Sequence, residues 1–189
     1  MEYSTLDKLG VRVSRLGFGC MRFPLTAEGK IDEPRAAAML DTAYKAGVTY
    51  YDTAYFYHQH TGEAFLGRAM KRYPRDTFYL ATKMPMSIVE SLDHAKEIFE
   101  GQLAALQTDY VDFYLLHGVN GERWKQAQEM GIVDFLLEMQ KAGRIRHFGF
   151  SFHGSYEEFE TILTARDWDF CQIQLNFMDK DHQIGRAHV

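Results

Sequence analysis

The residues Tyr50-Tyr51-Asp52-Thr53-Ala54-Tyr55-Phe56-Tyr57 pass directly from an aromatic run into polar chemistry. Aromatic and β-branched runs of this kind are typical of short buried strands. The carboxylate of Asp52 therefore leaves the end of a predicted strand, and the phenol of Tyr57 follows in the next loop.

Two further apolar runs also end on an ionisable side chain. An FYLAT run leads into Lys83, and a VDFYLL run leads into His117. The carboxyl ends of parallel strands lie on one side of a sheet, where active sites of barrels and doubly wound sheets are found. We therefore expect Lys83 and His117 to share one site with Asp52 and Tyr57.

Strand patterns alternate with amphipathic helix patterns along the whole chain. Strands are predicted at residues 16–21, 50–52, 78–82, 111–116, 146–151 and 170–175. Helices are predicted from Asp32 to Gly47, over residues 63–72 and 87–107, from Ile132 to Gly143, and from the capping box of Ser155 and Glu158 onward. Residues 3–15 carry a hairpin pattern with a turn at Leu9-Gly10.

This alternation predicts parallel βαβ units with right-handed crossovers, and so an α/β fold. A (β/α)8 TIM barrel needs eight strands, so six units make an incomplete barrel. A doubly wound sheet would carry a phosphate fingerprint after its first strand, but Gly17–Arg22 has no third glycine and no helix directly after it. We therefore expect about six of the eight β/α units of a TIM barrel, preceded by an N-terminal β-hairpin.

Composition limits the partners and the compartment. The 189 residues suffice for one domain with a core, and the net charge of −5 without a basic run argues against nucleic acid or an anionic membrane as partner. No apolar stretch approaches a membrane span, and the first residues lack a signal-peptide pattern, so we expect a cytoplasmic protein. The two cysteines, Cys20 and Cys171, are too few for a disulfide framework.

Five segments together resemble the aldo-keto reductases, in a match that extends from Tyr3 to about Gln183. They are Val13–Gly19, Asp52–Tyr57, Ala81–Lys83, Tyr114–His117 and Gly143–Ser151. The resemblance implies a (β/α)8 barrel that binds NADP(H), or alternatively NAD(H), and reduces small aldehydes or ketones. Residues 19–24 are similar to a bacterial branch whose members often add a C-terminal iron–sulfur domain, so a cluster is expected only if such a domain exists.

The resemblance also assigns roles to the four clustered residues. Tyr57 would protonate the alkoxide that forms when hydride reaches a carbonyl carbon. Lys83 would lower the pKa of that phenol, and Asp52 would hold Lys83 in place. His117 would orient the carbonyl oxygen.

Cofactor contacts follow from the same resemblance. Ser151 and Gln172 match the residues that hold the nicotinamide carboxamide, although Phe152 stands where many relatives have Asn, and Asn176 falls near the pocket floor. The expected cofactor contacts are Gly19, Cys20, Met21, Asp52, Ser151 and Gln172. No metal site is expected, because His58 and His60 lack a third ligand at supporting spacing; they are interpreted as rim residues.

The family pattern contains two more strands than this chain shows. The tail Ile184–Val189 can be encoded by the codons of a common sequencing adapter, so we expect a partial barrel domain over residues 1–183 and a non-native tail over 184–189. Expressed alone, such a fragment would be inactive.

Two other functions stay open at this point. The same barrel could sense its cofactor as a regulatory module without turnover. An isomerase or aldolase would instead use Lys83 as a Schiff-base nucleophile. The physiological substrate, the choice between NADP and NAD, and the oligomeric state are not predicted.

Overall fold

The computed structural model describes residues 1–175. The expectations for Asn176, for the end of the family resemblance near Gln183 and for the tail 184–189 lie outside the described residues.

The chain begins with the predicted β-hairpin. Strand β1 (Tyr3–Leu6) pairs antiparallel with β2 (Val11–Ser14), so the prediction is confirmed. A short 3-10 helix, η1 (Asp7–Leu9), and Gly10 with φ +65° connect the two strands. This positive φ favours glycine, which has no Cβ to clash.

Within the described residues a second, larger sheet is entirely parallel. Its strands are β3 (Phe18–Gly19), β4 (Tyr50–Asp52), β5 (Tyr79–Met84), β6 (Val111–Val119), β7 (Ile145–Phe152) and β8 (Phe170–Gln172). They lie side by side in the order in which they occur in the chain. A doubly wound sheet would reverse its order at a switch point. Sequential order is that of a barrel wall, so the predicted incomplete barrel is confirmed.

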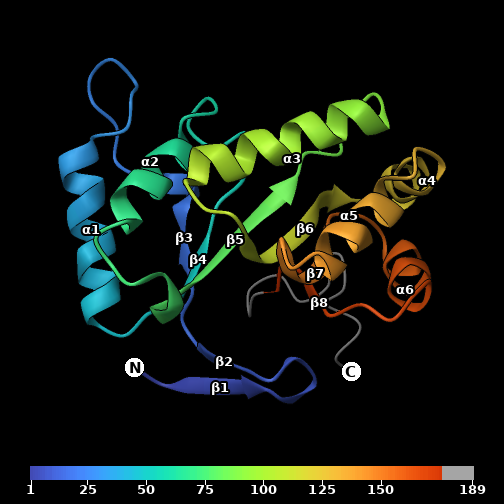
Figure 1. The fold of residues 1–189 in the computed structure, drawn as a ribbon, viewed down its shortest axis with the longest axis horizontal. Helices are drawn as coiled ribbons and strands as arrows, with labels where there is room; N and C mark the ends of the chain where they lie inside the picture. The colour runs from blue at the N-terminus through green and yellow to red at the C-terminus, as the bar shows by residue number, and fades with distance from the viewer. Residues whose placement is uncertain (176–189) are drawn as a thin grey trace.

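Within residues 1–175, six α-helices lie around this sheet, with α1 and α2 at the left, α3 along the top and α4 to α6 at the right in Figure 1. They are α1 (Glu33–Lys45), α2 (Gly62–Met70), α3 (Leu92–Leu106), α4 (Gly121–Glu129), α5 (Ile132–Lys141) and α6 (Tyr156–Thr164). Two predicted helix starts are confirmed in atomic detail. Asp32 caps α1 by accepting from the Arg35 amide at 3.2 Å, and Ser155 and Glu158 form the capping box of α6.

Other boundaries differ from the predictions for local reasons. The helix predicted from Ser87 begins at Leu92, because the Ser91 side chain caps it by accepting from the His94 amide at 3.2 Å. The strand predicted over residues 16–21 shortens to β3, because Cys20–Arg22 turn into a 3-10 helix, η2.

Helix α4 was not predicted at all. It buries only Trp124 and Ala127, and most of its remaining residues are polar. Two buried positions are too few to produce a readable helical period. Met39 of α1 and Leu163 of α6 are 42% and 40% exposed, because the buried stripe of each helix is narrower than its apolar pattern.

The alternation of side chains along the strands creates two apolar clusters, one on each face of the sheet. On β6, Tyr114 and Leu116 belong to the cluster between sheet and helices. Phe113 and Leu115 belong to a separate cluster with Ala81 of β5. Hairpin residues pack against this second cluster: Leu9, Val11 and Val13. The hairpin therefore closes the floor of the barrel interior.

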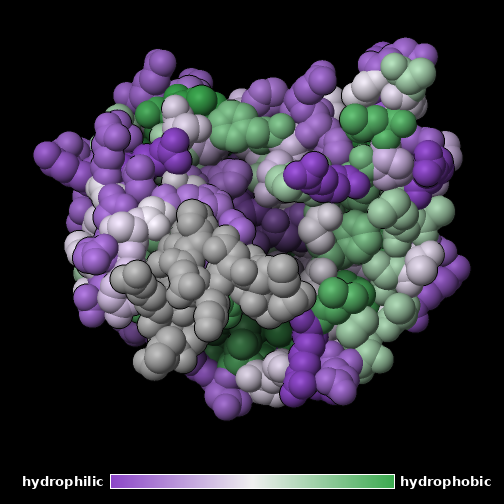
Figure 2. Space-filling view, turned by 180° about the vertical axis from the view of Figure 1, so that it is seen from behind, coloured by the Kyte–Doolittle hydropathy of each residue, from purple (hydrophilic) through white to green (hydrophobic). Residues whose placement is uncertain are grey.

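The opposite side of the molecule is seen in Figure 2, where hydrophilic surface borders a central hollow. Among residues 1–175, no helix has the length and apolar character needed to cross a membrane.

One buried carboxylate connects three strands at the ends that are distant from the predicted site. Asp112, near the start of β6, is fully buried and pairs with Arg75 at 2.7 Å and Arg146 at 3.0 Å. It also accepts a hydrogen bond from the Leu80 amide at 2.9 Å. This carboxylate connects β5, β6 and β7 at their amino ends.

Replacing Asp112 with Ala should lower the free energy of unfolding by about 3–5 kcal/mol, because two cations and a buried amide lose their acceptor. Urea denaturation of the complete gene product measures this loss. The exposed Asp109→Ala is the matched control, and it should change stability by less than about 0.5 kcal/mol. A loss below about 1 kcal/mol for Asp112→Ala would contradict the assignment.

Candidate functional site

The strand alternation delivers three of the four predicted residues to the interior face at the carboxyl ends of β4, β5 and β6. Asp52 ends β4, Lys83 pairs in register with Leu115, and His117 follows two residues further along β6. Tyr57 comes from the loop after β4. A cavity of about 180 Å³ is lined by Tyr57, Lys83, His117, Ser151, Phe152, His153, Gln172, Ile173 and Gln174. The structure thus brings the predicted residues together.

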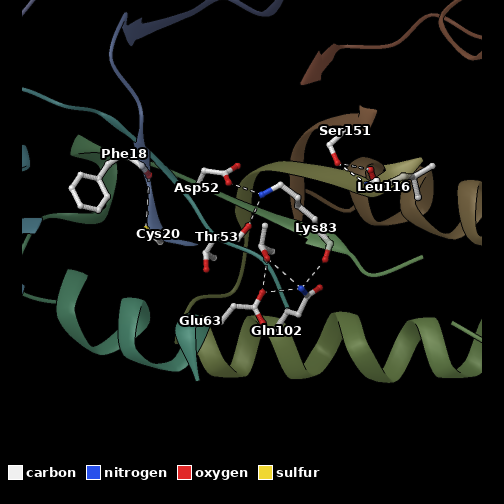
Figure 3. Close-up of polar contacts among 11 residues, drawn as sticks. Phe18, Cys20, Asp52, Thr53, Glu63, Lys83, Gln102, Leu116 and Ser151 are labelled. Carbon is white, nitrogen blue, oxygen red and sulfur yellow. Dashed lines mark hydrogen bonds and ion pairs between the residues drawn. The ribbon is translucent and has the colours of Figure 1, made fainter. Parts of the chain in front are cut away.

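Lys83 and Asp52 form a buried ion pair. Lys83 Nζ donates to Asp52 Oδ1 at 2.5 Å and to the Thr53 carbonyl at 2.8 Å (Figure 3). Burial raises the pKa of Asp52, and the adjacent Lys83 cation opposes that rise. The ammonium group is therefore held at a fixed point beneath the cavity.

Tyr57 lies next to both Lys83 and His117. Lys83 Nζ is 5.3 Å from the centroid of the Tyr57 ring, and the imidazole of His117 is 6.3 Å away in an edge-to-face arrangement. Burial, followed by the charges of Asp52 and Cys20, raises the pKa of Tyr57 to about 12. This direction differs from the expected lowering by Lys83, since burial penalises the phenolate and Asp52 partly neutralises the lysine. The phenol keeps its proton at neutral pH.

His117 is neutral at physiological pH. Burial first, and then the positive charges of Lys83, His153 and Arg123, lower its pKa to about 4. A neutral imidazole can donate one N–H while its other nitrogen accepts. His117 can therefore orient a carbonyl oxygen without carrying charge itself.

The two residues expected to hold a carboxamide lie side by side on β7 and β8. Ser151 pairs in register with Gln172, and both line the cavity. Ser151 Oγ accepts from the Gly118 amide at 2.8 Å and donates to the Leu116 carbonyl over a long 3.5 Å. Its hydrogen is weakly held and can turn toward a ligand.

The segment Gly19-Cys20-Met21 forms the turn after β3. The Cys20 side chain is fully buried in the core, and burial raises its pKa, so only its backbone is open to a ligand contact. Met21 is exposed, and the space around Gly19 is open. His58, interpreted as a rim residue, is instead half-buried and stacks on Phe23, with its Nε2 3.1 Å from the Cys20 carbonyl oxygen.

The model of the Aldo/keto reductase family matches residues 15–185. The chain belongs to this family. It is 29% identical over 191 residues to the aldo-keto reductase YhdN of Bacillus subtilis, a match that covers 96% of this chain and 56% of that protein. The chain spans about half the length of the curated relatives it matches.

Solved structures of aldo-keto reductases share the fold. The holo form from Bacillus halodurans is 30% identical with a TM-score of 0.76, covering 93% of this chain and 58% of its own. An aldo-keto reductase from Klebsiella pneumoniae, solved in complex with NADPH, is 25% identical with a TM-score of 0.65 and covers 86% of this chain and 54% of its own.

A polar network on the helix side of the sheet was missed by the sequence analysis. Gln102 of α3 donates to Glu63 Oε1 at 2.8 Å and to the Lys83 carbonyl at 3.0 Å, and Tyr114 donates to Gln102 at 2.6 Å (Figure 3 shows part of it). Thr82 also donates to Glu63. The sequence signal that could have revealed this network was Glu63, a glutamate within the apolar face of the helix predicted over residues 63–72. The network holds the backbone of Lys83 from the helix side of the sheet.

The geometry opposes the aldolase or isomerase alternative. A Schiff-base lysine must lose its proton before it can attack a carbonyl. The carboxylate of Asp52 stabilises the charged form of Lys83 instead. No group of three or more His, Cys, Asp or Glu that could hold a metal ion occurs among residues 1–175.

The low pKa of His117 makes stability depend on pH. Between pH 6.5 and about 4 the unfolded chain binds a proton at this site that the folded chain does not, so stability falls as pH drops through that range. His117→Gln should reduce the pH-dependent change in the free energy of unfolding by up to about 3 kcal/mol. Urea denaturation at pH 7 and pH 4.5 tests it, with the exposed His60→Gln as control. An unchanged pH dependence would rule out a depressed pKa at His117.

Proposed function

We propose that this protein is an NAD(P)H-dependent oxidoreductase that reduces aldehyde or ketone carbonyls to alcohols, and that its barrel domain covers residues 1–183. The observation that carries the proposal is one cavity lined by Tyr57, His117 and Lys83, in which the Lys83 ammonium forms a buried ion pair with Asp52. Membership of the aldo-keto reductase family supports it.

The residues around the cavity fit a nicotinamide cofactor. Asp52 Oδ2 is buried and has no donor at good hydrogen-bond geometry among the described residues, although the nearby Gln172 amide lowers the pKa of Asp52, so this oxygen can accept from a ribose hydroxyl. Ser151 and Gln172 offer a hydroxyl and an amide at the cavity wall, which complement a carboxamide. When bound, the cofactor supplies the hydride.

Tyr57 is the proposed general acid. An alcohol is about as weak an acid as water, whose pKa is about 15.7. A phenol with a pKa of about 12 therefore still transfers its proton to an alkoxide downhill. The high pKa also ensures that Tyr57 is protonated whenever a substrate arrives.

Lys83 and His117 assist this proton transfer. As negative charge moves from the substrate oxygen to the phenolate, the fixed Lys83 cation stabilises it in a site of low dielectric. The neutral His117 ring donates to the carbonyl oxygen and aligns it with the phenol. Asp52 acts as the positioning residue for Lys83.

Tyr57→Phe should reduce turnover by about 10²–10⁴-fold, because the ring still packs while the acid is removed. Lys83→Met should behave similarly, and His117→Gln should cost less with small aldehydes because a neutral donor remains. Steady-state NADPH oxidation with an aldehyde substrate by the complete gene product measures each loss.

Cofactor titration separates these effects from misfolding. NADPH affinity should be unchanged in Tyr57→Phe. The matched control is Tyr73→Phe, which removes a hydroxyl bound to Asp41 and should leave turnover intact. Near-normal turnover of Tyr57→Phe at saturating substrate would refute the assignment. Cofactor binding by the wild type without turnover of any aldehyde would favour the regulatory module.

We expect the complete gene product to bind NADPH more tightly than NADH, as the NADPH complex of the Klebsiella relative suggests. Fluorescence titration gives both dissociation constants. Gln172→Ala should weaken both by the same factor, because it acts at the nicotinamide end that the two cofactors share. Equal dissociation constants in the wild type would contradict the preference.

A further inference from the structure

A second cavity, of about 230 Å³, lies beside the proposed catalytic cavity. It shares His117 and His153 with the first. Its remaining lining residues come from the loops after β4 and β5, from the end of β6 and from the first turn of α4: Phe56, Pro85, Ser87, Gly118 and Arg123. Because the two cavities share a wall, a substrate whose carbonyl group lies at His117 can extend into the second one.

Arg123 is the cation fixed in this second cavity. Its backbone amide donates to the Asn120 side chain at 3.0 Å, in the first turn of α4. Its Nη1 donates to the Gly118 carbonyl at 2.7 Å, one residue after His117. A guanidinium has five N–H donors in a planar fork, so this single bond positions the group and leaves most of its donors for another partner.

The acid that packs against the start of α4 does not neutralise Arg123. Glu158 of α6 accepts from the Gly121 amide at 3.0 Å through one oxygen and from the Ser155 amide at 2.9 Å through the other. Within residues 1–175, Arg123 forms no ion pair with a carboxylate. The positive charge of Arg123 is therefore available to a ligand in the second cavity.

Two cationic side chains, Lys83 and Arg123, lie close enough to His117 to lower its pKa. The charge of Lys83 is paired with Asp52, whereas Arg123 has no such partner among the described residues. The chain as a whole has a net charge of −5, so a positive region in a concave site is a local feature that favours an anionic ligand. The ring of Phe56, 6.4 Å from that of His117, offers an apolar wall in the second cavity.

We propose that Arg123 binds a carboxylate group of the carbonyl substrate, so that the preferred substrates are aldehydes or ketones that carry a carboxylate. A carboxylate fits better than a phosphate. One edge of the guanidinium is already bound to the Gly118 carbonyl, and the remaining edge has two N–H donors, which match the two oxygens of a carboxylate. The inference rests on the proposed carbonyl reduction at Tyr57.

The test compares 4-carboxybenzaldehyde with 4-nitrobenzaldehyde, whose nitro group has nearly the same shape without the charge. In the complete gene product, kcat/KM should be higher for the carboxylate. Arg123→Gln should lower kcat/KM for the carboxylate by about 10- to 100-fold, mainly through KM, as expected for a lost charge-assisted hydrogen bond. It should leave the nitro substrate within about twofold, and Arg123→Lys should recover part of the loss.

Lys125→Gln is the matched control, because it removes the same charge from an exposed position on the same helix. It should leave the preference unchanged. Equal losses on both substrates in Arg123→Gln, or no preference in the wild type, would overturn the carboxylate site. A more than tenfold loss of NADPH affinity in Arg123→Gln would also overturn it, since the anion would then belong to the cofactor.

Calorimetry without cofactor distinguishes failure of this inference from failure of the proposed function. The probe is 4-carboxybenzaldehyde, titrated into wild type and into Arg123→Gln. Arg123-dependent binding without turnover of any aldehyde would keep the site and refute the reductase. Turnover of neutral aldehydes together with Arg123-independent binding would keep the reductase and refute the site.

Discussion

The ammonium of Lys83 and the carboxylate of Asp52 lie 2.5 Å apart on the interior face of the sheet, with both side chains buried. Two charges in such a place are costly unless each satisfies the other, and losing either one leaves an uncompensated charge. Groups on both faces of the sheet stabilise this ion pair. The Thr53 carbonyl accepts from the same ammonium, and the network of Glu63 and Gln102 holds the Lys83 backbone from the helix side.

The position of that pair also sets the properties of its neighbours. Tyr57 is in contact with a lysine that Asp52 partly neutralises, so its phenol stays protonated. His117 lies among positive groups and stays neutral. Burial is the largest cause of both pKa shifts, because it disfavours the phenolate and the imidazolium alike, so one small cavity holds two neutral groups that can each donate a hydrogen bond.

The fold and the clustering of the four proposed catalytic residues were predictable because each depends on a periodic signal. Apolar runs that end at Asp52, Lys83 and His117 imply strand ends, and parallel strands bring their ends together. The direction of the Tyr57 pKa was not predictable, because it depends on how deeply the ring is buried and on its position relative to Asp52. Helix α4 was missed because it buries only Trp124 and Ala127. Arg123, which lies on that helix, was missed with it.

The carboxylate of Asp112 and the imidazole of His117 lie near opposite ends of the same strand, β6, five positions apart along the extended chain. At about 3.3 Å per residue this is about 16 Å, beyond the range over which substitutions usually influence one another. The ion pairs of Asp112 hold the strands together at one end, while the proposed catalytic residues lie at the other end. Because the two ends are separated, residues at the site can change during evolution without loss of the ion pairs that hold the strands. Changes at Arg123 or Phe56 can redirect substrate choice by small steps while the anchoring end of the barrel wall stays intact.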